Sequence, residues 1–149
     1  MRNENVNEPQ NQQSCQNAVM QSVLKGQNLR VGNLVYFNGN HKEVGVVSEI
    51  LKNDLTKAAP YKIGINHRVD VYYDIDKLKP IKISEEWLLK CGFKRFPWGL
   101  VVDDLLFKDD LKCSYLKLQV GNGFETSVNY IHELQNLYFS LTGRELTVA

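Results

Sequence analysis

Histidine and cysteine side chains are common metal ligands and catalytic groups, and this 149-residue chain scatters them along its length. The three histidines stand alone, without an HxH or HExxH spacing, at positions His41, His67 and His132. The three cysteines are odd in number and too widely spaced for a CxxC zinc site or a disulfide framework: Cys15, Cys91 and Cys113. We therefore expect reduced thiols, no metal site and no cofactor.

Two pairs of neighbouring aspartates, Asp103-Asp104 and Asp109-Asp110, bracket the short segment LLFK. Carboxylates that converge in space can bind a cation or share acid–base chemistry. Neighbours on a strand point to opposite faces, however, so the simpler interpretation is that each pair marks a turn at one end of a strand.

Motifs for covalent catalysis and for phosphate binding are missing. There is no GxSxG nucleophile turn and no GxxxxGK(S/T) loop, and Gly121-Asn122-Gly123 has the composition of a hairpin turn. Cys91 ends an apolar helical segment without a histidine nearby in the sequence, which favours packing over reactivity. The sequence therefore predicts a noncatalytic protein, not an enzyme.

The segment FKRFPW, Phe93 to Trp98, mixes aromatic and basic side chains, which are common at the centres of protein interfaces. One interpretation is a loop that Trp98 anchors in the core. The other is a recognition loop, with these candidate partner-binding residues: Lys94, Arg95, Phe96 and Trp98.

The C-terminal helical segment carries a polar group that could face one way together: His132, Gln135 and Asn136, with Phe139 one turn on. The interpretation that we favour places Phe139 in the core and the other three on a solvated flank. A polar recognition cluster is the alternative.

A nucleic-acid surface is a further alternative, because aromatic and basic residues recur in the first half of the chain. The aromatic residues are Tyr36, Phe37, Tyr61, Tyr72 and Tyr73; the basic ones are Lys42, Lys52, Lys57, Lys62 and Arg68. Exposed members of these sets could stack on bases and contact phosphates. Bulk charge does not favour this, because 18 basic and 17 acidic residues leave a net charge of only +1.

The elements that must position these residues begin after a polar arm. Residues 1 to about 13 are rich in Asn, Gln and Glu and predict a flexible segment. A short helix from Cys15 to Lys25 follows, capped by Ser14, with an apolar face that includes the candidate partner-binding residues Val19, Val23 and Leu24. The interpretation that we favour is that this helix packs on its own domain, and a docking helix for a partner is the alternative.

Four short β segments follow in residues 29–80: LRVGNLVYF, EVGVVSEI, YKIGI and VDVYYDI. Turn residues at 38–40 and 66–68 predict two hairpins. Such closely spaced strands indicate a small β-barrel-like unit of the Src-homology-3-like kind.

Residues 81–149 predict a second unit with the order α-β-β-β-α, or four strands in place of three. Ser84 caps the helix EEWLLKCGF, strands are expected at 98–102, 105–108, 113–120 and 124–128, and an amphipathic helix ends at Gly143 and covers their sheet. The fold class is therefore α+β. No stretch reaches the about 20 apolar residues of a membrane span, and the N-terminus lacks the apolar core of a signal peptide, so we expect a cytoplasmic protein.

The order of LRVGNLVYF, LKPIKISEEWLLKCGF and VNYIHELQNLYFSLTGREL resembles a group of small uncharacterised proteins from phages and mobile elements of Bacteroidetes-type bacteria. The block HELQNLY, residues 132–138, is the most distinctive, and the resemblance covers Leu29 to Leu146. It implies a phage or mobile-element origin in a bacterial host cell, with virion association left open, and no activity.

Together these features predict an accessory protein that binds another protein: a host factor, a defence component or a virion protein. One alternative is nucleic-acid binding, and another is an anti-defence protein that sequesters a nucleotide signal. Pairing of two copies through an open edge strand is also left open.

Overall fold

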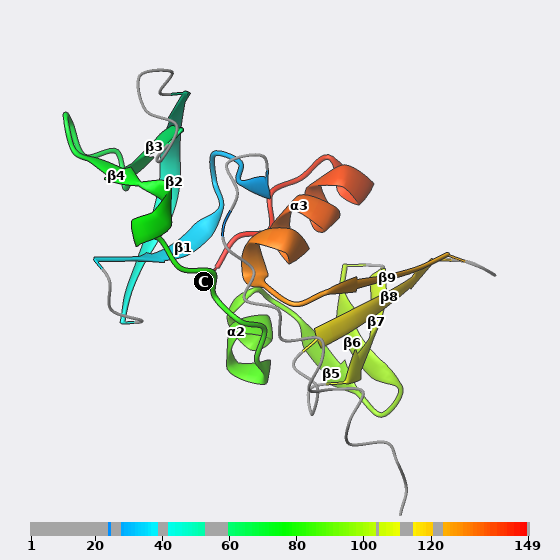
Figure 1. Cartoon of the computed structure of the whole chain (residues 1–149). Helices are drawn as coiled ribbons and strands as arrows, with labels where there is room; N and C mark the ends of the chain where they lie inside the picture. Colours follow the sequence, from blue (N-terminus) through cyan, green and yellow to red (C-terminus); the bar gives the residue numbers. More distant parts are fainter. Residues whose placement is uncertain are drawn as a thin grey trace, which may run out of the picture.

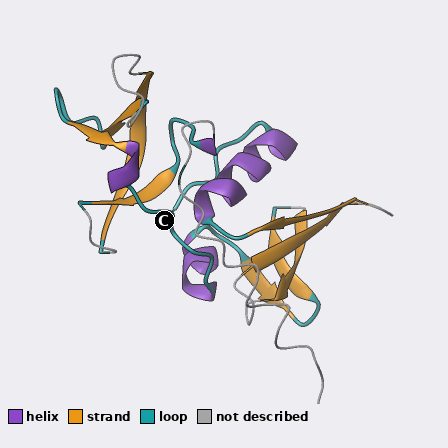
Figure 2. Cartoon of the chain, in the orientation of Figure 1, coloured by secondary structure: helices purple, strands orange, loops and turns teal. Residues whose placement is uncertain are grey.

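The C-terminal helix lies between two antiparallel sheets in the computed structural model, which describes residues 24, 28–38, 42–52, 60–103, 105–110, 115–120 and 124–148 (Figure 1). The architecture is α+β with few helices, as predicted (Figure 2). None of the described helices is long and apolar enough to cross a membrane. The predicted arm, with Val19 and Val23, lies outside the described residues except for Leu24 and Asn28.

The first sheet is a meander in the order β1-β2-β3-β4, made of β1 (Leu34–Phe37), β2 (Glu43–Lys52), β3 (Tyr61–Ile65) and β4 (Tyr72–Asp74). Both predicted hairpins are confirmed. In the second, Asn66 and His67 have φ angles of 56° and 55°, and the Arg68 N–H donates to the Ile65 carbonyl at 3.2 Å. This is the type I′ geometry whose twist matches that of paired strands.

The chain then returns to β1 through a 3-10 turn, η3 (Ile75–Lys77). Tyr36 and Lys79 exchange two backbone hydrogen bonds, of 2.9 and 3.0 Å, on the edge of β1 that faces away from β2. Within the described residues β1 and β4 do not pair with each other, so the sheet is open. The predicted closed barrel is not confirmed.

The second half opens with the predicted helix α2 (Glu85–Lys90), where the Ser84 hydroxyl accepts the Trp87 N–H at 3.4 Å. Five strands follow as an antiparallel meander: β5 (Lys94–Phe96), β6 (Gly99–Val102), β7 (Leu105–Asp110), β8 (Tyr115–Val120) and β9 (Phe124–Val128). The last four correspond to predicted strands.

β5 corrects the prediction, because Lys94–Phe96 is a strand where the sequence indicated a loop. It is a short edge strand, and all three of its side chains are exposed. A strand with no buried face has no apolar–polar alternation, and Pro97 directly after it is typical of a loop. The described residues of this unit therefore form five strands between the two helices, not three or four.

Helix α3 (Ile131–Thr142) ends at Gly143, whose φ of 69° stops the helix in the left-handed region, as predicted. It packs against β1 as well as β9, so it touches both sheets (Figure 1). Its apolar side chains join a core made mainly of residues 81–146, to which the first sheet contributes Leu34. The first sheet has a separate core, which contains Leu24.

Candidate functional site

The hairpin of β5 and β6 presents two aromatic rings to solvent. Phe96 and Trp98 stack with their centroids 5.2 Å apart and their planes at 19°, and the exposed fractions of the two residues are 36% and 63%. The interpretation that Trp98 is a core anchor is therefore wrong. We call residues Lys94–Trp98 the aromatic hairpin.

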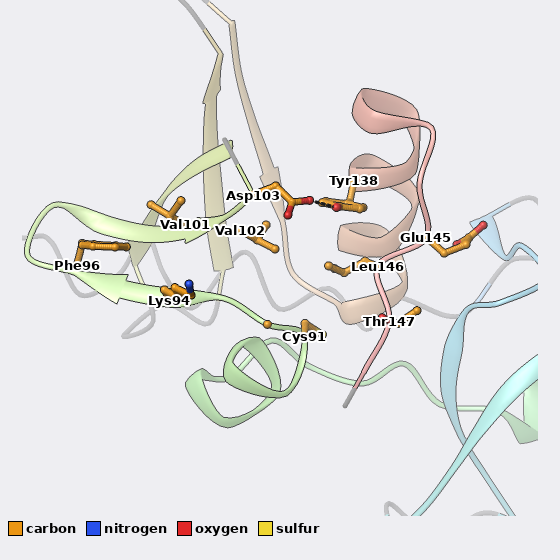
Figure 3. Close-up of a pocket in the computed structure, with 11 residues that line it drawn as sticks. Cys91, Lys94, Phe96, Val101, Val102, Asp103, Tyr138, Glu145, Leu146 and Thr147 are labelled. Atoms are coloured by element: carbon orange, nitrogen blue, oxygen red, sulfur yellow. Dashed lines mark hydrogen bonds between the residues drawn. The ribbon is translucent and has the colours of Figure 1, made fainter.

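Alternation along β5 sends its side chains to two faces. Arg95 points to α2, where its guanidinium pairs with the Glu85 carboxylate. Lys94 and Phe96 point the other way and line a cavity of about 470 Å³ (Figure 3). The sequence predicted one recognition loop from Lys94, Arg95, Phe96 and Trp98. In the structure Arg95 lies on a different face of the hairpin from Lys94 and Phe96.

Strand β6 of the hairpin packs closely against β7, the next strand of the sheet. Gly99 has a φ of 149°, and a Cβ there would lie 2.5 Å from the Phe107 carbonyl oxygen. Phe107 is fully buried and meets the Phe93 ring edge-on at 5.4 Å. Only glycine fits the first residue of β6, because the facing atom is backbone and cannot move aside.

The cavity is bounded by the aromatic hairpin, the end of β6 and the segment after α3 (Figure 3). Its apolar lining comes from Cys91, Val101, Val102 and Leu146. Burial raises the pKa of the Cys91 thiol to about 11, so this sulfur is a neutral packing group and a poor nucleophile.

Asp103 stands in the turn between β6 and β7, as predicted, with a φ of 47°. One of its carboxylate oxygens accepts the Tyr138 hydroxyl and an Arg144 N–H, the latter at 2.8 Å. The hydrogen bond to Asp103 is the main cause that raises the pKa of Tyr138, which therefore stays a neutral phenol. Asp104 lies outside the described residues, and Asp109-Asp110 end β7.

Charges around the cavity are mostly cancelled within the chain. Arg144 pairs with Asp103, and Arg30 pairs with Glu145, which also lines the cavity. Lys94 is the exception: it has no ion-pair or hydrogen-bond partner among the described residues. No group of three or more His, Cys, Asp or Glu side chains in the described part of the chain could hold a metal ion.

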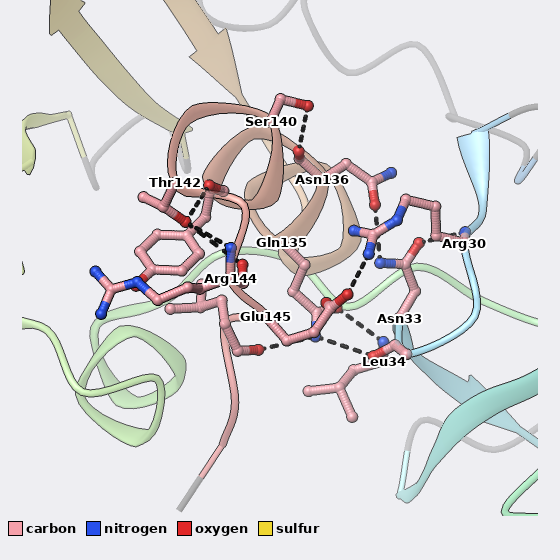
Figure 4. Close-up of polar contacts among 12 residues, drawn as sticks. Arg30, Asn33, Leu34, Gln135, Asn136, Ser140, Thr142, Arg144 and Glu145 are labelled. Carbon is pink, nitrogen blue, oxygen red and sulfur yellow. Dashed lines mark hydrogen bonds and ion pairs between the residues drawn. The ribbon is translucent and has the colours of Figure 1, made fainter.

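The polar residues of α3 are not a solvated flank. Gln135 is 2% exposed; its Oε1 accepts the Leu34 N–H at 2.9 Å, and its Nε2 donates to the carbonyls of Gly32 and Leu146 at 3.2 and 3.3 Å (Figure 4). Asn136 accepts from the buried Asn33 at 3.0 Å. These side chains join α3 to the first sheet, so they are structural and not a recognition cluster.

Phe139 is 38% exposed instead of buried, and the Arg30 guanidinium lies 3.8 Å from its ring centroid. The prediction that Phe139 is buried and that the polar residues of α3 face solvent was wrong. A helix between two sheets buries side chains on more than one of its faces. The signal in the sequence was that His132 and Gln135 each directly follow an apolar residue of the stripe, Ile131 and Leu134.

The remaining candidates are placed as follows. Leu24 is 4% exposed in the first core, so this one residue of the predicted helix packs on its own domain. On the first sheet the Tyr72 hydroxyl donates to Glu49 at 2.8 Å, and the Lys62 ammonium pairs with Asp74 at 2.7 Å. Lys57 and His41 lie outside the described residues.

No protein-family model matches the chain, and searches of curated proteins and of solved structures give no significant match either.

Proposed function

We propose that this is a noncatalytic accessory protein of a phage or mobile element, and that it binds another protein through the aromatic hairpin. The observation that carries the proposal is the exposed Phe96–Trp98 stack. Large aromatic side chains dominate the energy of many interfaces when a partner removes them from water. Two rings that already stack on one hairpin have less conformational freedom to lose when a partner binds.

The charges favour a protein partner over a nucleic acid. Nucleic-acid binding draws on several free cations that neutralise phosphates. Around this surface Arg95, Arg144 and Arg30 are each paired with a carboxylate of the same chain. Among the described residues of this surface, Lys94 has no ion-pair partner, and one such lysine beside two aromatic rings suits a mixed apolar and polar interface instead.

We also propose that the first sheet is an incomplete barrel of the Src-homology-3-like kind, which stays open between β1 and β4 among the described residues. Support comes from the 3-10 turn after β4 and from the return of Lys79 to the free edge of β1. As a result, β1 pairs with β2 along one edge and with Lys79 along the other. Strand β1 of this sheet contacts α3, and α3 also contacts β9 of the second sheet, to which the aromatic hairpin belongs.

The test is capture of partners from phage-infected host lysate after nuclease treatment, with tagged wild type, Trp98→Ala and Phe96→Ala. We expect one protein to copurify with wild type and to be lost by at least about tenfold with each variant, the size of an interface hot spot. Val69→Ala is the matched control, because Val69 is 83% exposed and lies in the β3–β4 turn of the other sheet.

Equal capture by wild type and the Trp98 and Phe96 variants would contradict the proposal. So would recovery of nucleic acid alone, bound in a salt-sensitive manner before nuclease treatment. Thermal unfolding of each variant shows whether it is folded, and the exposure of both rings predicts little loss of stability.

A further inference from the structure

Lys94 is the one cation among the described residues that line the cavity. It lies beside Phe96 on the same face of β5, and its side chain reaches the cavity between the hairpin and the segment after α3 (Figure 3). The two carboxylates of the lining, Asp103 and Glu145, are each paired with an arginine. The positive charge of Lys94 is therefore not cancelled by its neighbours.

One part of the cavity wall can hold an apolar group, beside the polar side chains of Asp103, Tyr138, Glu145 and Thr147. Val102 and Leu146 are buried, and Cys91 contributes a neutral thiol. The rim residues Lys94 and Phe96 are exposed, so the cavity opens to solvent beside the aromatic hairpin. A volume of about 470 Å³ falls within the range of small-ligand sites, about 300–1,000 Å³.

We propose that this cavity binds a carboxylate-bearing apolar group of the protein partner: the carboxylate pairs with the Lys94 ammonium, and the apolar part lies on Val101, Val102 and Leu146. The occupant is an acidic peptide segment in which an apolar side chain neighbours an Asp, a Glu or the C-terminal carboxylate. This inference rests on the proposed function, because the partner supplies the segment. It adds a charge requirement that the aromatic stack alone does not impose.

The experiment uses the whole 149-residue chain labelled with ¹⁵N and three small probes: N-acetyl-phenylalanine, its uncharged amide, and AMP. We expect N-acetyl-phenylalanine to shift the amide signals of Lys94, Val102 and Leu146, with an affinity of about 1 mM. The amide, which lacks the charge, should bind about threefold more weakly, because solvent weakens an ion pair at the exposed rim of the cavity.

Variants then test the role assigned to Lys94. Lys94→Gln should weaken binding of N-acetyl-phenylalanine by about threefold, and Lys94→Arg should retain it. Lys108→Gln is the matched control, because Lys108 is an exposed lysine of the same sheet outside the cavity lining, and it should bind like wild type.

Any of the following outcomes overturns the inference. The amide binds as well as the acid; or Lys94→Gln binds like wild type; or AMP alone shifts these signals, in which case the cavity is a nucleotide site. If the probe fails while Trp98→Ala still loses the captured protein, the inference falls and the proposed function stands. If the probe binds through Lys94 while Trp98→Ala and Phe96→Ala keep the captured protein, the proposed function falls.

Discussion

The imidazole of His132 is buried near the start of α3, 1% exposed, with its ring stacked on Tyr130 at 5.8 Å. Its Nδ1 has no hydrogen-bond partner among the described residues. Burial lowers the pKa of His132 to about 4, so the ring is neutral in the folded protein at neutral pH. A buried neutral histidine of this kind ties the free energy of unfolding to pH.

We expect the free energy of unfolding to fall by about 3 kcal/mol through His132 as the pH drops from 7 to 4. The unfolded chain takes up a proton near the ordinary histidine pKa of about 6.5, whereas the folded chain resists it until about 4. The contribution is therefore complete above pH 6.5 and is lost toward pH 4.

Urea unfolding at both pH values, followed by circular dichroism, measures this loss. His132→Gln should remove most of that part of the pH dependence, and His67→Asn should keep it, because His67 is exposed and asparagine tolerates its left-handed backbone. Equal pH dependence in wild type and His132→Gln would show that this histidine is not the source.

At the scale of elements, the hairpin β5–β6 depends on how closely β6 lies to β7. Two glycines flank this region, Gly92 before β5 and Gly99 at the start of β6, with φ angles of 82° and 149°. A Cβ at Gly92 would meet nothing within 4 Å, but at Gly99 it would lie 2.5 Å from the Phe107 carbonyl oxygen. Substitution of Gly92 therefore tests backbone strain alone, whereas substitution of Gly99 tests backbone strain together with steric overlap.

Gly92→Ala should lower the free energy of unfolding by about 1 kcal/mol, the cost of the left-handed conformation alone. Gly99→Ala adds a clash with backbone and should cost about 2 to 4 kcal/mol. Chemical denaturation measures both losses. The Gly99→Ala substitution should also displace the Phe96–Trp98 stack, which would change the fluorescence of Trp98. Gly92→Ala should leave this fluorescence unchanged. Equal losses in the two variants would contradict this account of the β6–β7 contact.

For the whole molecule, α3 is the element that both sheets share. Gln135 bonds to Leu34 and Gly32 of the first half and to Leu146 of the second, and Arg30 pairs with Glu145. Leu34 of β1 also enters the core of the second half. Loss of α3 would leave buried surface of both sheets open, so we expect the two sheets to unfold together.

Native-state hydrogen exchange tests this on the amides of Ile63 in β3 and Phe107 in β7. Gln135→Leu leaves one N–H and two carbonyls without their partner, so it should lower the opening free energy at both amides by a similar amount, about 2 kcal/mol. Ser140→Ala, on the exposed end of α3, should change neither by more than about 0.5 kcal/mol. A change at one sheet only would show that the halves open independently.

What the sequence by itself determined is local. Ser84 caps α2, Gly143 ends α3, and Asn66-His67 turns the second hairpin, because each of these depends on backbone preferences and hydrogen bonds within a few residues. The α+β class followed from the change between two periodicities of apolar residues.

Only the tertiary structure decided which side chains are buried, exposed or unpaired. The hydrogen bond between Asn33 and Asn136 joins residues 103 apart, and no local pattern carries that distance. The same holds for Trp98, which is 63% exposed and stacks on Phe96, and for Lys94, whose charge is left uncancelled because Arg144 and Arg30 pair with the carboxylates of the cavity lining. Burial and charge balance are properties of contacts between distant segments, and these form only when the two sheets pack around α3.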